Sequence, residues 1–168
     1  IQNSIWWIEE FGIDSYRIDT YTYPDQEFMS VLADRIDKEF PQFFMFGETW
    51  VHGIQIQNYF IEDNKNRLPF NSNLQSVTDF TWYFALEKGI HEKTDWSTGI
   101  SRLYLALTGD YLYKNPQNLV TFVDNHDIAR RYGHCGEDMT KFKIGIGLLM
   151  TSRGIPSLYY GTEVLMKA

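Results

Sequence analysis

Residues 12–21 read GIDSYRIDTY, a β-branched and aromatic run that carries an arginine and an aspartate two positions apart. Alternate residues of a strand leave the same face, so Arg17 and Asp19 should project together from a strand over residues 13–18. A buried strand that carries two charged side chains on one face needs a reason for them. The stretch therefore predicts a strand that ends on a candidate functional residue, Asp19.

The same pattern recurs along the chain: an apolar run closes on a polar residue and is followed by a helical stretch. The further runs are residues 43–46 before Glu48, residues 74–78 before Asp79, residues 119–123 before the tetrapeptide 124–127, and residues 155–160 before the tripeptide 161–163. Such continuous apolar runs are typical of parallel strands buried on both faces.

Apolar residues at helical spacing fill the gaps between these runs. They predict helices over residues 28–40, 82–90, 100–112 and 142–150, and residues 4–11 read as the end of a first helix. In the helix 28–40 we expect a buried stripe, which comprises Phe28, Val31, Leu32, Ile36 and Phe40.

Strands that alternate with helices predict parallel βαβ units. Successive strand ends lie about 30 to 50 residues apart, which suits a doubly wound sheet or part of a (β/α)8 barrel. A doubly wound nucleotide-binding sheet would carry a Gly-rich phosphate loop after an early strand, and none of the four visible strand-to-helix transitions has one. The predicted fold class is therefore α/β, a partial (β/α)8 barrel.

Composition narrows the function classes. The chain has 168 residues, of which 43% are hydrophobic and 17% aromatic, enough for a packed core, and some of the rings could line a sugar site. A net charge of −7 with dispersed basic residues argues against nucleic-acid binding. The single Cys135 excludes an internal disulfide and predicts an inert thiol, and the absence of a long apolar run argues against membrane insertion.

Three acids follow predicted strands: Asp19, Glu48 and Asp127. Retaining cleavage of a glycosidic bond needs an ionised nucleophile and a protonated acid about 5–5.5 Å apart. Neighbouring strands lie about 4.8 Å apart, so acids at adjacent strand ends meet this requirement. We expect Arg17 to keep Asp19 ionised and oriented, and the charges of the other two acids to keep Glu48 a proton donor.

Each feature also has a structural interpretation. Arg17 and Asp19 could form a buried salt bridge, Glu48 could favour the start of a helix, and Asp127 could cap a helix that begins at Ile128. The occurrence of all three acids at strand ends favours a common site.

Four stretches resemble motifs of the α-amylase family of glycoside hydrolases. GIDSYRIDTY resembles its fourth-strand motif, FGETW (46–50) its fifth, FVDNHD (122–127) its seventh and GIPSLYYGTE (154–163) its eighth strand. The resemblance implies that residues 1–168 are the C-terminal portion of a catalytic (β/α)8 barrel, covering roughly strands four to eight, with strands one to three upstream. The missing starting Met agrees with a chain that begins inside a longer protein, so the compartment stays open.

By position, the resemblance implies Asp19 as nucleophile and Glu48 as general acid/base. Asp127 would bind sugar hydroxyls and favour the distorted ring, Arg17 would position the nucleophile, and His126 would hydrogen-bond the sugar.

Beyond the main motifs, Asp79 at the sixth-strand position is assigned a structural role. Many family members carry Lys-His after the nucleophile, whereas residues 19–25 here read DTYTYPD, which resembles bacterial neopullulanases and cyclomaltodextrinases. Tyr23 and Trp50 could offer ring faces to a sugar or pack in the core.

The expected function is that of a retaining α-glucan hydrolase acting on α-1,4 and in some relatives α-1,6 bonds of an α-glucan, maltooligosaccharide or cyclodextrin. Two alternatives stay open: a transglycosylase with the same intermediate, and a non-catalytic glucan-binding or scaffold segment. The chemistry requires no cofactor; the resemblance leaves calcium open and assigns no metal ligand. A barrel cut in this way would expose two strand edges, which predicts low stability or self-association.

Overall fold

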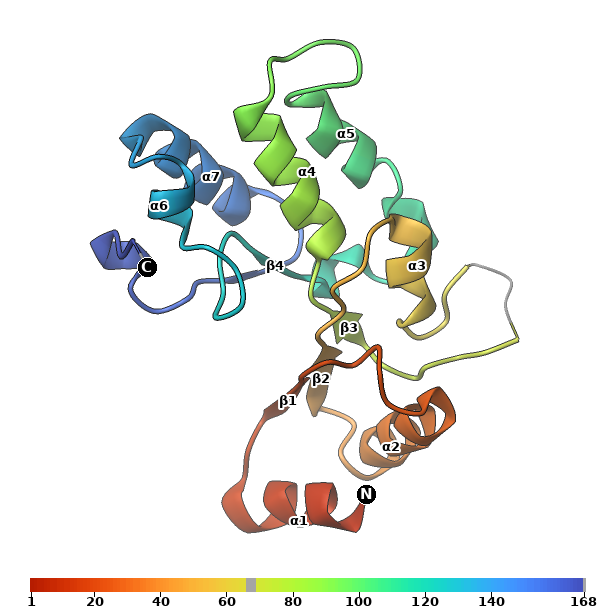
Figure 1. Cartoon of the computed structure of the whole chain (residues 1–168). Helices are drawn as coiled ribbons and strands as arrows, with labels where there is room; N and C mark the ends of the chain where they lie inside the picture. Colours follow the sequence, from red (N-terminus) through yellow and green to blue (C-terminus); the bar gives the residue numbers. More distant parts are fainter. Residues whose placement is uncertain (66–68, 168) are drawn as a thin grey trace. The chain divides into compact units, whose positions relative to one another are not determined.

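The computed structural model describes residues 1–65 and 69–167, which form two compact units (Figure 1). The first unit contains residues 1–78 and 111–115, and the second contains the rest of the described chain. Each unit is built on a parallel sheet.

The first unit carries a three-stranded sheet of order β1-β2-β3. Its elements in chain order are α1 (Gln2–Phe11), β1 (Ser15–Ile18), α2 (Gln26–Glu39), β2 (Phe44–Gly47), α3 (Ile54–Tyr59) and β3 (Ser76–Val77). The strands β1 and β2 pair in parallel from Ser15 opposite Phe44 to Ile18 opposite Gly47.

The second unit pairs two parallel strands, with Val120 opposite Ile155 and Phe122 opposite Ser157. Its helices and strands are α4 (Phe80–His91), α5 (Ser101–Leu107), β4 (Val120–Phe122), α6 (Arg131–His134), α7 (Met139–Thr151) and β5 (Ile155–Ser157). Short 3-10 turns of this unit lie at Pro116–Asn118 and Thr162–Val164, and a third, Asp110–Leu112, begins here and continues into residues 111–115 of the first unit.

The α/β class and the parallel pairing agree with the sequence prediction, but the sheets do not close into a barrel. The expectation that the strands are buried on both faces is wrong for β1 and β5. Every residue of β5 is exposed, and β1 alternates between exposed and half-buried residues. Each pairs with a single strand within the described chain, so one flank lacks a neighbour that would cover its side chains. No helix among the described residues is long and apolar enough to cross a membrane.

The buried face of α2 differs from the predicted stripe. Met29, Ala33 and Ile36 are buried, whereas Phe28 and Val31 are about half exposed. Both sets of residues satisfy the helical spacing, and periodicity alone does not decide which of two adjacent stripes turns inward.

The predicted helix over residues 100–112 ends early, at Leu107. The hydroxyl of Thr108 donates a hydrogen bond to the carbonyl of Leu105 at 2.7 Å, and Gly109 follows. Both residues are poor helix formers, so a 3-10 turn replaces the last helical turn. The helices α3 and α6, of six and four residues, were not predicted because such short segments show no periodicity.

The core of the second unit packs α4 against α5, α7 and the end of β4. Its buried side chains are Trp82, Ala85, Leu86, Leu103, Val123 and Leu149. Beside it, the rings of Tyr83 and Phe122 stack with centroids 5.1 Å apart and Phe80 packs edge-on against both. Much of the high aromatic content in this unit therefore serves the core.

Asp79 is fully buried at the start of α4, where its carboxylate accepts a hydrogen bond from the backbone N–H of Trp82 at 2.9 Å. It also forms an ion pair with Arg153, which binds both oxygens of Asp110 at 2.7 and 2.8 Å. The carboxylate thus caps a helix and balances a buried guanidinium, which fits the structural role expected for Asp79.

We predict that Asp79→Ala lowers the free energy of unfolding by about 2 kcal/mol or more, because it removes a buried helix cap and one of the two carboxylates that bind the buried Arg153, whose pair with Asp110 remains. Asp138→Ala is the matched control, since Asp138 caps α7 from an exposed position and forms hydrogen bonds to the N–H groups of Thr140 and Lys141. The control should cost about 1 kcal/mol. Urea unfolding measures both, and equal losses in the two variants would contradict the buried-pair argument.

Candidate active site

The register of β1 and β2 brings Asp19 and Glu48 directly after neighbouring strand ends. The backbone N–H of Glu48 donates to the carbonyl of Ile18 at 2.8 Å, which extends the parallel pairing by one residue. The N–H of Thr20 donates to Oε2 of Glu48 at 3.0 Å, so this carboxylate lies against the residue that follows Asp19. Glu48 is buried and Asp19 is exposed.

Arg17 and Asp19 project together, as the alternation of the strand predicts. Nη1 of Arg17 lies 2.7 Å from Oδ1 of Asp19, and the side chains are 33% and 59% exposed. The pair is therefore not a buried salt bridge that serves the core, and the alternative structural interpretation of these two residues is wrong. A charge-assisted hydrogen bond of this length fixes the orientation of the carboxylate.

Tyr21 explains why a glycine precedes Glu48. Its fully buried ring lies against Gly47 so closely that a Cβ there would fall 2.5 Å from Cγ of the tyrosine. The N–H of Tyr21 also donates to the carbonyl of Glu48 at 3.0 Å, and Thr20 turns the chain with φ at 48°. Burial raises the pKa of the Tyr21 hydroxyl well above its usual range, so the ring acts as a neutral packing element.

In the second unit the tetrapeptide 124–127 follows β4, and its first residue is an anchor. Asp124 is buried, and its carboxylate accepts hydrogen bonds from the N–H of Arg131 at 3.0 Å and the hydroxyl of Thr162 at 2.9 Å. These contacts tie the loop after β4 to the segment after β5. The sequence motif gave no separate role to Asp124.

Asn125 caps the turn after Asp124. Its Oδ1 accepts hydrogen bonds from the N–H groups of Asp127 at 2.8 Å and Ile128 at 3.1 Å. The interpretation of Asp127 itself as the cap is therefore wrong. The Asp127 carboxylate instead lies 3.1 Å from Nε2 of His126, with the two side chains 43% and 48% exposed.

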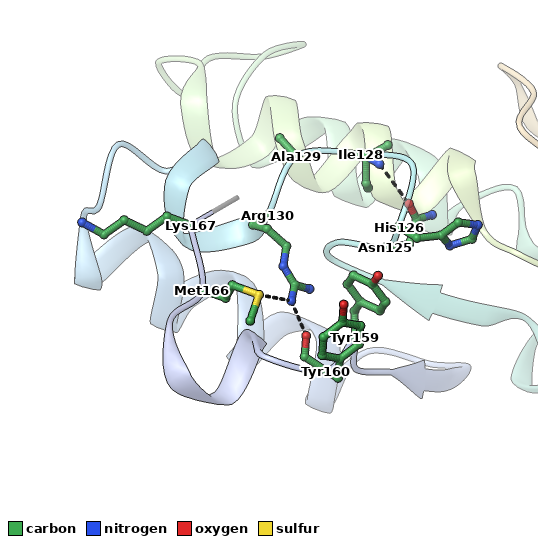
Figure 2. A pocket seen from close by; sticks show the side chains of 9 residues that line it. All are labelled: Asn125, His126, Ile128, Ala129, Arg130, Tyr159, Tyr160, Met166 and Lys167. Carbon is green, nitrogen blue, oxygen red and sulfur yellow. Dashed lines mark hydrogen bonds between the residues drawn. The ribbon is translucent and has the colours of Figure 1, made fainter.

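A hollow of about 380 Å³ lies beside His126 (Figure 2). Its centre is the buried guanidinium of Arg130, 4.2 Å from the ring centroid of Tyr159 and hydrogen-bonded to the Tyr160 carbonyl. Nη2 of Arg130 also lies 2.9 Å from Sδ of Met166. The hollow combines aromatic faces with polar groups, a lining suited to a hydroxyl-rich ligand.

The structure thus places the predicted site residues in two groups. Arg17, Asp19 and Glu48 lie together in the first unit, and His126 lies beside Asp127 in the second. Tyr23 and Trp50 belong to the first unit.

Tyr23 is 84% exposed, so the interpretation of Tyr23 as a core residue is wrong, and Trp50 is about half exposed. Cys135 is buried, and burial raises the pKa of its thiol, which agrees with an inert cysteine.

Sequence reasoning missed the residues that hold the site in place, above all Tyr21, Asp124 and Arg130. The glycine before Glu48 was a usable signal of a close backbone approach. The adjacent pair Arg130–Arg131 was a second signal, because only two residues separate it from the strand-end motif 124–127. In the structure both arginines are buried.

The family's sequence profile, described as "Alpha amylase, catalytic domain", matches residues 2–168. The chain belongs to the α-amylase family. The cyclomaltodextrin glucanotransferase of Geobacillus stearothermophilus is 31% identical over 160 residues, covering 95% of this chain and 21% of that protein. The α-amylase of Streptomyces lividans is 30% identical over 176 residues, covering 94% of this chain and 18% of that protein.

Solved structures agree with this assignment. The α-amylase of Geobacillus thermoleovorans, crystallised with acarbose, superposes with a TM-score of 0.83 at 26% identity, covering 99% of this chain and 36% of that one. A three-domain cyclomaltodextrin glucanotransferase gives a TM-score of 0.81 at 27% identity, covering 98% of this chain and 32% of that one. This chain therefore spans about a fifth of the length of these curated relatives and about a third of the length of the chains in these structures. The relatives are hydrolases and glucanotransferases, and they do not single out neopullulanases.

We predict that Gly47→Ala lowers the free energy of unfolding by about 1–3 kcal/mol, because the new methyl group overlaps the buried Tyr21 ring. Gly147→Ala is the matched control: Gly147 is exposed in α7, with no atom within 4 Å of an added Cβ. A helix gains about 0.5–1 kcal/mol from this change. Thermal unfolding measures both, and a Gly47→Ala variant as stable as the control would contradict the close approach.

Proposed function

We propose that the protein is a retaining enzyme that acts on α-glucans, with Asp19 as the nucleophile and Glu48 as the general acid/base. The observation that carries the proposal is the position of both acids at the ends of adjacent parallel strands, with the Thr20 N–H 3.0 Å from Oε2 of Glu48. Strand spacing of about 4.8 Å suits the separation of about 5–5.5 Å that retaining enzymes use.

In the first step a carboxylate oxygen of Asp19 bonds to the anomeric carbon while the glycosidic C–O bond breaks. Glu48 gives its proton to the leaving oxygen. In the second step Glu48 takes a proton from water, whose oxygen bonds to the anomeric carbon as Asp19 leaves. Arg17 holds the nucleophile in position throughout. These groups complete the reaction, so the mechanism needs no cofactor.

His126 and Asp127 are proposed to bind the hydroxyls of the sugar ring that is attacked. Their side chains lie 3.1 Å apart and are each about half exposed, so the imidazole can donate a hydrogen bond to a ligand and the carboxylate can accept one. The exposed rings of Tyr23 and Trp50 are proposed as stacking faces for neighbouring sugars.

A second candidate is transglycosylation, in which a sugar hydroxyl replaces water in the second step. Two observations favour it: the relatives include several cyclomaltodextrin glucanotransferases, and the exposed aromatic rings could hold an acceptor sugar. Within the family, the stretch 19–25 supports a neopullulanase or cyclomaltodextrinase type of specificity, including α-1,6 bonds and cyclodextrins. Chromatography of the products with and without added maltose separates hydrolysis from transfer.

We predict that Asp19→Ala lowers kcat/KM on an activated maltosyl substrate by about three orders of magnitude or more, in the protein that carries this sequence. Added azide should restore turnover, because it fills the place of the missing nucleophile and yields the β-glycosyl azide. Glu48→Ala with azide should yield the α-anomer, because azide then attacks the covalent intermediate from the opposite face.

Asp14→Asn is the matched control, since Asp14 precedes β1 at the opposite end of the strand from Asp19 and is exposed. It should retain the activity of the wild type. NMR of the azide products identifies the anomers. A β-azide from Asp127→Ala instead of Asp19→Ala would reassign the nucleophile, and an inactive wild-type protein that still binds maltooligosaccharide would favour the scaffold alternative.

A further inference from the structure

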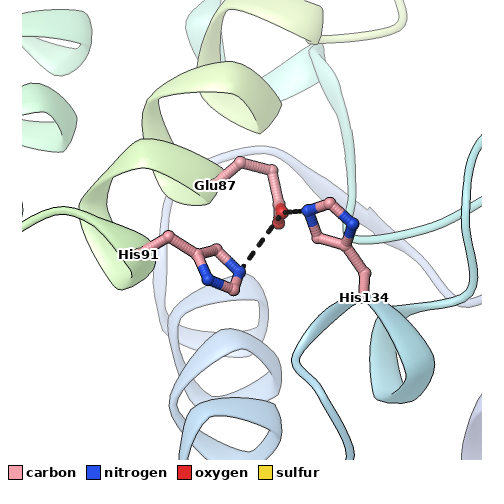
Figure 3. A group of neighbouring side chains, drawn as sticks. All are labelled: Glu87, His91 and His134. Atoms are coloured by element: carbon pink, nitrogen blue, oxygen red, sulfur yellow. Dashed lines mark ion pairs between the residues drawn. The ribbon is translucent and has the colours of Figure 1, made fainter.

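Three potential metal ligands converge in the second unit, on the helices α4 and α6 (Figure 3). Glu87 and His91 lie one turn apart on α4, and His134 ends α6. One oxygen of Glu87, Oε2, lies 2.7 Å from Nε2 of His134 and 3.8 Å from Nε2 of His91. All three ligand atoms lie within 4.8 Å of one another.

The contacts of Glu87 are divided between its two oxygens. Oε1 forms an ion pair with the buried guanidinium of Arg131. Oε2 is buried and accepts no hydrogen bond of good geometry within the described chain, although two imidazole nitrogens lie close to it. These imidazoles pair with Oε2 as ions only when they are protonated, whereas a shared cation would satisfy all three atoms with neutral imidazoles.

The distances suit a small cation. A tetrahedral ion that binds nitrogen and oxygen at about 2.0–2.1 Å holds its ligand atoms about 3.3 Å apart. The two distances from Glu87 Oε2, 2.7 and 3.8 Å, fall on either side of this value, and all three ligand atoms lie within 4.8 Å, so side-chain shifts would be needed to reach the tetrahedral spacing. Side chains 32% and 44% exposed at His91 and His134 leave room for an ion to enter and for a water ligand.

We propose that Glu87, His91 and His134 bind one Zn²⁺ or a similar divalent transition-metal ion, with water as the fourth ligand. Two imidazoles and one carboxylate are a known ligand set for zinc, whereas calcium and magnesium prefer oxygen ligands only.

The site would join α4 to α6, the short helix that follows the loop 124–130. The N–H of Arg131, at the start of α6, binds the Asp124 carboxylate that anchors this loop. Arg131 also binds Oε1 of the Glu87 carboxylate. This contact would orient the other oxygen, Oε2, toward the metal. The metal would therefore steady the loop without contacting the sugar site.

The test uses the protein that carries this sequence, freed of metal with a chelator and titrated with ZnCl₂ in a calorimeter. We expect one equivalent of saturable binding, and a rise in Tm with added zinc because the metal binds the folded state. Replacing zinc by Co²⁺ should give the visible absorption of a four-coordinate site with no thiolate charge-transfer band. His91→Ala and His134→Ala should each weaken zinc binding by at least about tenfold.

His52→Ala is the matched control, because His52 is an exposed histidine of the first unit. It should bind zinc as the wild type does. The proposal is overturned if the wild type shows no saturable binding of one equivalent, or if His91→Ala and His134→Ala bind zinc like the control. Circular dichroism of each variant checks that lost binding is not lost folding, and the result is independent of whether the protein cleaves glucans.

Discussion

The contact between the Tyr21 ring and the backbone of Gly47 determines how β1 and β2 end. Because glycine has no side chain, the ring can lie directly on the strand, and the chain after Asp19 turns back over the neighbouring strand end. The N–H of Thr20 then meets the Glu48 carboxylate. The relative position of the two acids thus depends on a packing contact that involves neither acid.

In the second unit a buried carboxylate, that of Asp124, holds the turn after the strand in place of such a packing contact. Asp124 receives hydrogen bonds from Arg131 and Thr162, and these fix the turn from which His126 and Asp127 project. In both units the exposed polar groups follow a parallel strand, and a buried neighbour holds the turn in place. This arrangement explains why two aspartates three positions apart have different environments: Asp124 is buried and Asp127 is exposed.

The sequence predicted what depends on strand order and alternation. It located the five strands to within a few residues, the contact of Arg17 with Asp19, and the succession of Asp19 and Glu48 on paired strands. It failed where tertiary packing chooses between equal patterns, as in the buried face of α2. It also failed where a segment is too short to be periodic, as in α6.

Gly145 in α7 shows a packing constraint that a single sequence does not reveal. Gly145 is a poor helix former within the predicted helix 142–150, yet it is buried and an added Cβ would lie 2.7 Å from Nε of Arg131. The glycine thus makes space for a guanidinium that comes from another helix, and α7 forms despite the cost of glycine in a helix. Helix propensity correctly describes Gly145 as a poor helix former, but it does not indicate that the missing Cβ leaves room for the Arg131 side chain.

That guanidinium links the packing of the second unit to its cluster of ligands. Arg131 is completely buried, and Glu87 supplies the negative charge beside it. A carboxylate with only this task could keep both oxygens on the guanidinium, whereas Glu87 directs Oε2 toward two imidazoles. The ion pair with Arg131 therefore accounts for Oε1. Oε2 can pair with the two imidazoles when they are protonated, and a shared cation accounts for the same convergence when they are neutral.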